Sequence, residues 1–277
     1  MTPIVLAAGA AVLWGTSDFC GGKGSRHAGA LSVGLMSQVA SLPVLVAALL
    51  LVSGTPSAAD LGWGTLAGVA GLGGVVLLYR GLSTGAMTVV SPVTAVTAAV
   101  LPLGVGLVLD GPLGPTALAG VVIAVTAIAM VSTGHRGAKA PVTSGLVALA
   151  LGSGAMFGLA FVLLGQVDPE SGLWALVGLR AGALAVGLPL ALQLRTDLRL
   201  SRHAWGWTAL AGSLDVLGSA FYLTAVMQGH LSIVAVLSSL YPASTVLLAL
   251  GIDRERLRAV QVAGLAFAAT ALALVAL

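Results

Sequence analysis

Residues 144–166 read SGLVALALGSGAMFGLAFVLLGQ, a run of 23 residues without a charged side chain. The hydrocarbon core of a bilayer is about 30 Å thick, and an α-helix needs about 20 apolar residues to cross it. The run lacks the alternation of apolar and polar residues that a lipid-facing β-strand requires. Because backbone N–H and C=O groups in lipid must bond within the chain, this stretch predicts a transmembrane α-helix.

The whole chain of 277 residues has the same character. Hydrophobic residues make up 58% of it, charged residues make up 8%, and the mean hydropathy is +1.08. A soluble domain carries roughly a quarter charged residues, so a water-soluble fold is excluded. We predict an all-α integral membrane protein, solvated by the lipid bilayer, with ten transmembrane helices. The spans run from Pro3 to Gly22, Ala30 to Val52, Leu61 to Leu82, Met87 to Leu109, Leu113 to Ser132, Ser144 to Gln166, Gly172 to Leu194, Ala204 to Met227, Leu231 to Ile252 and Leu257 to Leu277.

Local patterns recur at a constant offset along the chain, which indicates two copies of one unit. For example, Val33-Gly34-Leu35 returns 144 residues later as Val177-Gly178-Leu179, and the polar linker GHRGAKAP (Gly134 to Pro141) lies at the midpoint. We therefore predict two five-helix repeats, 1–137 and 138–277, in one integrated transmembrane domain. Since five is an odd number, the second repeat enters the membrane from the opposite side. Inverted repeats of this kind hold a substrate near the midplane, between the two halves.

The charges at the ends of the spans predict an orientation. Eleven of the twelve Lys and Arg residues lie in or beside odd-numbered connections, at Lys23, Arg26, Arg80, Arg136, Lys139, Arg195, Arg199, Arg202, Arg254, Arg256 and Arg258. The even-numbered connections carry acidic residues instead. Since basic loops stay in the cytoplasm, we predict a multi-pass protein of the plasma (inner) membrane with both termini outside. The basic residues form no single patch, so no nucleic-acid partner is expected.

Three charged residues fall within the predicted spans: Asp18, Arg180 and Asp215. Each intramembrane charge costs at least about 2.5 kcal/mol on insertion scales. Arg180 and Asp215 lie at similar depths on antiparallel helices, so they are predicted to form a buried ion pair, to act on a substrate or a proton, or to reach the lipid interface by snorkelling. Asp18 lies near the inner end of its helix, where a solvated carboxylate is the simpler interpretation.

Glycine and proline within the spans predict packing and kinks. Glycines four residues apart, such as Gly64 with Gly68 and Gly178 with Gly182, let two helix backbones approach closely. Proline removes an N–H and clashes with the preceding turn, so it kinks a helix. The prolines within the predicted spans include Pro92, Pro102, Pro189 and Pro242.

An intramembrane enzyme is a rival class, and it would need a nucleophile with its base, or metal ligands, at one depth. All four histidines fall in connections, and Cys20 is the only cysteine. We therefore expect no enzyme, no metal and no cofactor. A structural or scaffolding membrane protein is a third class that the sequence leaves open.

Three segments carry a recognisable family pattern: Leu13-Trp14-Gly15, Tyr79 to Pro92, and Tyr222 to Gly264. They resemble the ten-helix EamA-like branch of the drug/metabolite transporter superfamily, and the resemblance covers essentially the whole chain. Glu255 matches a glutamate of that family, whereas the first repeat has Asp110-Gly111-Pro112 at the equivalent place.

This resemblance implies a secondary transporter that works by alternating access. The solute would be a small organic metabolite, an amino acid or a drug-like molecule, which is exported or exchanged. A proton is the candidate coupling ion, and the expected unit is a monomer or a weak dimer.

In the resembling family the first, third, fourth, sixth, eighth and ninth helices surround a central cavity. This arrangement implies a set of lining residues, although each aromatic taken singly is more readily explained as core or interfacial belt. Small and hydroxylated stripes on the fourth and ninth helices add two serines. The predicted substrate-binding or coupling residues are Trp14, Asp18, Tyr79, Ser91, Phe157, Arg180, Asp215, Tyr222, Ser239 and Tyr241.

Overall fold

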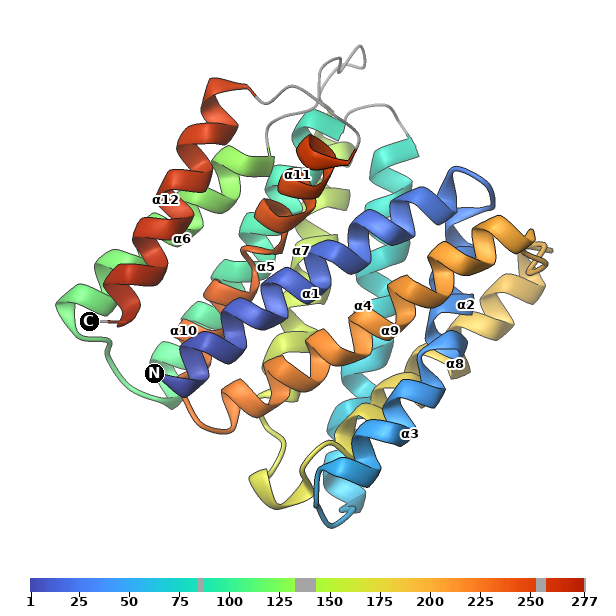
Figure 1. The fold of residues 1–277 in the computed structure, drawn as a ribbon, viewed down its shortest axis with the longest axis horizontal. Helices are drawn as coiled ribbons and strands as arrows, with labels where there is room; N and C mark the ends of the chain where they lie inside the picture. Colours follow the sequence, from blue (N-terminus) through green and yellow to red (C-terminus); the bar gives the residue numbers. More distant parts are fainter. Residues whose placement is uncertain (84–86, 133–142, 253–257, 277) are drawn as a thin grey trace.

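The computed structural model describes residues 1–83, 87–132, 143–252 and 258–276. All regular elements within these residues are helices (Figure 1). They are α1 Thr2–Ser25, α2 Ala30–Ala40, α3 Leu42–Leu51, α4 Ala58–Ser83, α5 Met87–Leu109, α6 Pro115–Ser132, α7 Ser144–Leu164, the short 3-10 helix η1 Pro169–Ser171, α8 Ala175–Gln193, α9 Arg202–Val226, α10 Leu231–Ser238, α11 Tyr241–Gly251 and α12 Ala259–Ala276.

These helices make ten membrane spans, which confirms the predicted fold class. Eight described segments are long and apolar enough to cross a bilayer, and two shorter apolar helices, Val93–Leu109 and Ala259–Val275, complete the set. The second span consists of α2 and α3, and the ninth consists of α10 and α11. The predicted repeat boundary at 137/138 and the linker around it lie outside the described residues.

The second and ninth spans are each broken, whereas the sequence predicted ten continuous helices. Ser41 separates α2 from α3, and α11 begins at Tyr241 after α10 ends at Ser238. A proline follows each break, Pro43 in one case and Pro242 in the other, and proline fits the first turn of a helix but not its interior. The Pro242 position was predicted as a kink. The Pro43 break was not.

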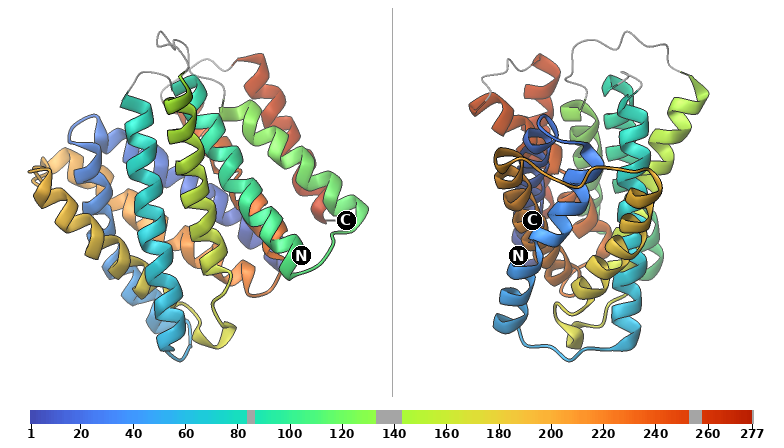
Figure 2. Two further views of the ribbon diagram at one scale, coloured as in Figure 1. Left: turned by 180° about the vertical axis from the view of Figure 1, so that it is seen from behind. Right: turned by 90° about the vertical axis from the view of Figure 1, so that its right-hand side faces the viewer.

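Contacts between helices come in matched pairs, as two equivalent repeats require. The contact of α1 with α9 corresponds to that of α7 with α4, and the contact of α5 with α7 corresponds to that of α10 and α11 with α1. Likewise α4 packs on α8 as α9 packs on α2, while α6 packs on its own equivalent, α12. Seen from behind, α4, α7 and α5 run side by side, and α6 lies against α12 at the edge (Figure 2). The ten spans therefore form two inverted five-helix repeats.

Four glycines bring α4 and α8 into backbone contact. Gly64 and Gly68 face Gly178 and Gly182, and a Cβ atom added to any of them would collide with a backbone carbonyl of the facing helix. Small residues at this spacing permit such an approach because no side chain separates the backbones. The packing role predicted for these glycines is thus present in the structure.

Both termini lie at one end of the bundle (Figure 1). Two acidic residues in the even-numbered connections bind backbone N–H groups there. The Asp60 carboxylate is buried and accepts hydrogen bonds from the Asp168 N–H, at 3.1 Å, and the Ser171 hydroxyl, at 2.7 Å. Asp110 accepts from the Leu231 N–H at 2.6 Å and so caps the start of α10. Acidic groups favour this position because the N-terminal N–H groups of a helix carry partial positive charge.

Candidate functional site

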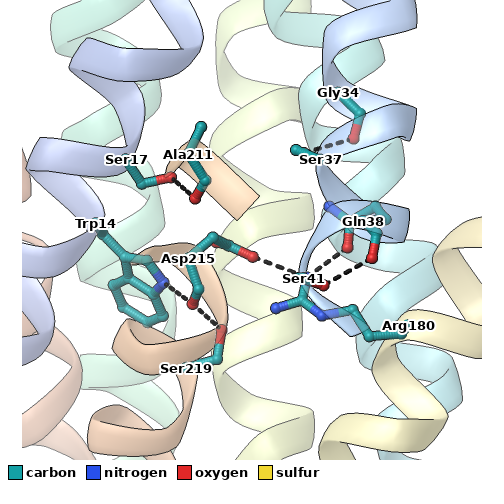
Figure 3. Close-up of polar contacts among 10 residues, drawn as sticks. All are labelled: Trp14, Ser17, Gly34, Ser37, Gln38, Ser41, Arg180, Ala211, Asp215 and Ser219. Atoms are coloured by element: carbon teal, nitrogen blue, oxygen red, sulfur yellow. Dashed lines mark hydrogen bonds and ion pairs between the residues drawn. The ribbon is translucent and has the colours of Figure 1, made fainter. Parts of the chain in front are cut away.

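A buried arginine joins three helices in the membrane-spanning part of the protein. The Arg180 side chain on α8 is only 2% exposed, and its Nη1 lies 2.7 Å from Oδ2 of Asp215 on α9. The same nitrogen donates a hydrogen bond to the side-chain carbonyl of Gln38 on α2. Figure 3 shows the guanidinium between these two partners. The ion pair predicted from helix depth is therefore formed, and it includes a third residue from the first repeat.

Two nitrogens of the same guanidinium are unused. Nε and Nη2 of Arg180 are buried, and neither has a hydrogen-bond partner within the described residues. A buried donor without a partner costs about 1–3 kcal/mol. Arginine can donate five hydrogen bonds in a planar fork. The site thus contains two buried donors that a suitable acceptor would satisfy.

Hydrogen bonds from α1 and within α9 fix the backbone that carries Asp215. The Trp14 indole N–H and the Ser219 hydroxyl both donate to the Asp215 carbonyl oxygen, at 3.2 Å and 2.8 Å (Figure 3). One turn earlier, the Ser17 hydroxyl donates to the Ala211 carbonyl at 2.8 Å. Helix α1 of the first repeat is therefore attached to α9 of the second beside the ion pair.

An aromatic cluster adjoins this attachment. The rings of Trp14, Phe161 and Tyr222 lie with centroids 4.9–5.6 Å apart. The Tyr222 hydroxyl donates to the Phe161 carbonyl oxygen at 3.0 Å, and the Tyr222 side chain is fully buried. Aromatic contacts at these separations stabilise a cluster beyond the area they bury. Tyr222 therefore supports the cluster from the core, while the partly exposed Trp14 and Phe161 form its open side.

The predicted lining residue Phe157 occupies a position equivalent to Trp14. A Cβ added to Gly74 would lie 2.9 Å from the Phe157 ring, and one added to Gly218 would lie 2.7 Å from the Trp14 ring. Both pairs are related by the 143–144-residue offset of the repeat. Each large ring thus packs over a glycine of the opposite repeat.

Asp18 faces the interior of the bundle although its side chain is exposed. A helix turns about 100° per residue, so Asp18 lies on the same face as Trp14, one turn away. Val5 and Val12, 68% and 56% exposed, lie about 120–140° around the helix and mark the lipid face. Because α1 continues to Ser25, Asp18 is about two turns from the helix end, further from it than the predicted end at Gly22 implied.

Asp18 adds a second carboxylate near the ion pair. It lies close enough to interact electrostatically with the Asp215 carboxylate and with the Tyr241 hydroxyl. If all three groups are ionised, Arg180 balances one of the two carboxylates and the formal charge is −1. Tyr241 itself is partly buried at the start of α11. Asp18, Arg180 and Asp215 therefore form one charged cluster, with Tyr241 and Trp14 at its edge.

The remaining predicted site residues do not join this cluster in the described structure. Ser239 is buried, and its hydroxyl donates to the Ala235 carbonyl of its own helix at 2.7 Å. This bond turns the side chain back on α10, so the predicted lining role of Ser239 has no support here. The side chains of Tyr79 and Ser91 lie outside the described part of the chain.

Two residues of the site were not predicted from the sequence. Gln38 is uncharged, so the search for intramembrane charges passed over it. Phe161 lies one helical turn after Phe157, and that spacing places both on one face of α7. A search for polar residues at the depth of Arg180 would have found Gln38, and a search by helical face would have found Phe161.

Ten spans in two inverted repeats, with a charged cluster where the repeats meet, define a polytopic membrane protein of the transporter type. The EamA-like transporter family matches residues 1–133 and 144–277, one match for each repeat, and the chain belongs to this family. Membership points to a membrane transporter of small solutes rather than an enzyme.

Solved structures agree on the fold. One crystal structure aligns with this chain at a TM-score of 0.77, covering 98% of this chain and 95% of its own, at 15% sequence identity. A sequence identity this low shows similarity of fold alone. No curated protein matches the chain.

Proposed function

We propose that the protein is a secondary transporter that moves a small organic solute across the plasma membrane by alternating access, as an exporter or exchanger. The observation that carries this proposal is the charged cluster of Asp18, Arg180 and Asp215. Charges within membrane spans are costly, and they mark substrate or ion pathways in transporters. Asp215 is 34% exposed and Asp18 is exposed toward the interior, so both are accessible between the helices.

The repeat structure supports the mechanism. Inverted repeats give one protein two related packings, and exchange between them opens a central site to alternate sides of the membrane. In this protein α1 of one repeat meets α9, α10 and α11 of the other around the cluster. The breaks between α2 and α3 and between α10 and α11 supply positions where a span can bend. Residues 1–137 and 138–277 are the proposed moving units.

We expect purified protein in liposomes to catalyse exchange of a labelled solute against an internal pool of the same solute. The screen would cover amino acids, organic acids, organic cations and drug-like molecules. Removing the exposed charge of Asp18, by Asp18→Asn, should lower the exchange rate by at least about tenfold, the effect of losing one charge-assisted contact of about 1.5 kcal/mol.

The matched control is Glu170→Gln, which removes an exposed acid at the end of the bundle and should leave exchange unchanged. The Asp18→Asn melting temperature should stay near that of the unmodified protein, because Asp18 makes no hydrogen bond with the described residues. Failure of every solute class to exchange would favour a scaffolding role over transport.

We also propose that both termini lie outside the cell. Helix α8 begins just after Asp168 and Glu170 and ends just before Arg195, Arg199 and Arg202, so these arginines lie at the opposite end of the bundle from the two acids. Basic connections are retained in the cytoplasm, so the arginine-bearing end should be inside.

Cysteine labelling in intact cells measures this orientation. After the buried Cys20 is replaced by serine, Glu170→Cys should react with an impermeant maleimide. Arg199→Cys should react only after the cells are opened. The reverse pattern would place the termini in the cytoplasm and overturn the orientation.

A further inference from the structure

We propose that the unused edge of the Arg180 guanidinium binds a carboxylate of the transported solute. This inference rests on the proposed transport function and names the chemistry that the site recognises. Nε and Nη2 lie on one side of the planar group, and both are free within the described residues. Two parallel N–H donors match the two oxygens of a carboxylate, which arginine binds in a bidentate fashion.

The protein holds the guanidinium so that this edge has no hydrogen-bond partner among the described residues, and both nitrogens are buried in this conformation. Nη1 is occupied by both Gln38 and Asp215, which come from α2 and α9. Their acceptor atoms fix the position of the group without bonding to Nε or Nη2. The arginine side chain is 98% shielded from solvent, so a carboxylate bound there would interact strongly, with little screening by water.

Because Nε and Nη2 are buried, a solute would reach them only when α8 and α9 move apart, and Asp215 is the more exposed member of the pair. The Asp215 side chain is 34% exposed, whereas Arg180 is 2% exposed. A solute carboxylate bound to this edge would share the guanidinium with Asp215. Sharing one guanidinium between two carboxylates weakens the Arg180–Asp215 bond, so solute binding would loosen α8 from α9. Binding and helix movement would then be coupled through one arginine.

Charge balance requires a positive group on the same solute or a proton. When Asp18, Arg180 and Asp215 are all ionised their formal charge is −1, and a solute carboxylate would make it −2. A solute ammonium near Asp18 restores the balance, and so does a proton on Asp18. The apolar part of the solute would meet the aromatic cluster of Trp14 and Phe161, which lies beside the Asp215 backbone.

Thermal melting of detergent-solubilised protein tests the inference with a matched set of probes. Phenylalanine carries a carboxylate and an ammonium, 3-phenylpropionate carries the carboxylate alone, and phenylalaninamide carries the ammonium alone. Phenylalanine should raise the melting temperature and phenylalaninamide should not. Stabilisation by 3-phenylpropionate that requires lower pH would identify a proton as the balancing charge. Stabilisation by phenylalanine alone would identify the ammonium.

Arg180→Lys isolates the two-donor edge, because lysine keeps the charge for Asp215 but presents no planar fork. Its apparent affinity for the carboxylate probes should fall by about 10- to 100-fold, the effect of losing charge-assisted hydrogen bonds of about 1.5–3 kcal/mol. Arg202→Gln, a change at an exposed arginine, should leave the affinity unchanged. If Arg180→Lys fails to fold, the double variant Arg180→Gln with Asp215→Asn provides the same comparison without an unpaired charge.

Asp215→Asn provides a readout that a purely structural arginine would not change. Without its competitor carboxylate, Arg180 should bind the acid probes more tightly, and the probes should restore part of the stability that this variant loses. Equal stabilisation by phenylalanine and phenylalaninamide would overturn the inference, as would no stabilisation by either acid. Solute exchange that is confined to amines or neutral solutes would overturn it while leaving the transport proposal intact. Exchange of no solute at all would instead refute transport.

Discussion

Replacing Asp215 with asparagine should lower the free energy of unfolding by about 3–5 kcal/mol, the typical cost of breaking a buried ion pair by removing one partner. The substitution keeps the size of the side chain but removes the charge that balances Arg180. The guanidinium would then have only neutral amide oxygens as acceptors, with Nε and Nη2 still unpaired within the described residues. A cation that is 2% exposed has no water to replace its partner.

The opposite truncation should cost less. In Arg180→Gln the unpaired charge is on Asp215, which is 34% exposed and therefore partly hydrated. The double variant Arg180→Gln with Asp215→Asn leaves neither charge and should recover much of the lost stability, since neutral replacement of a buried pair is often well tolerated. The expected order of stability thus reflects burial, because the loss of unfolding free energy is largest when the more buried residue keeps its charge without its partner.

Melting in mild detergent measures this order. A loss of 3–5 kcal/mol corresponds to a decrease of roughly 10 °C for a protein of this length. Asp168→Asn is the control, because it makes the same Asp-to-Asn change at the exposed end of the bundle. An Asp215→Asn protein with unchanged melting would show that the ion pair does not hold α8 and α9 together.

Much of the fold follows from the sequence because the bilayer imposes strict requirements on length and polarity. A segment such as residues 144–166 must be helical and must span, and the structure has α7 at Ser144–Leu164. The pairing of Arg180 with Asp215 could be predicted from the sequence because depth along a helix is proportional to residue number. The offset of the repeat predicted which helices are equivalent.

The side-chain arrangement of the site was harder to predict because these helices are apolar on every face. When lipid and core are both apolar, the hydrophobic pattern along a helix does not show which face contacts lipid and which packs against another helix. Tyr222 was predicted to line a cavity, but it is fully buried and bonded to the Phe161 carbonyl. The direction of Asp18 became clear only once α9 and α11 were placed beside α1. Such long-range placement is absent from any local window of sequence.

Gly68→Ala should be strongly destabilising, like the same change at the other glycines of the α4–α8 contact. A Cβ at this position meets the backbone carbonyl oxygen of Leu179 on α8, and a Cβ at Gly182 meets that of Thr65 on α4. A flexible side chain could rotate away, but a carbonyl within a helix cannot move without its helix. We expect a loss of about 3 kcal/mol, the upper part of the usual range for overpacking.

Gly71→Ala is the matched control, three residues along the same helix. A Cβ there has nothing within 4 Å, so the substitution should be neutral or stabilise α4 by up to about 1 kcal/mol through the better helix propensity of alanine.

Gly68→Ala combined with Gly182→Ala should cost less than the sum of the single changes, because one outward shift of α8 relieves both collisions. That shift would also move Arg180, which lies between Gly178 and Gly182 in sequence. Gly68→Ala should therefore weaken solute exchange beyond its effect on folding, and equal melting of Gly68→Ala and Gly71→Ala would refute the close approach of the two helices.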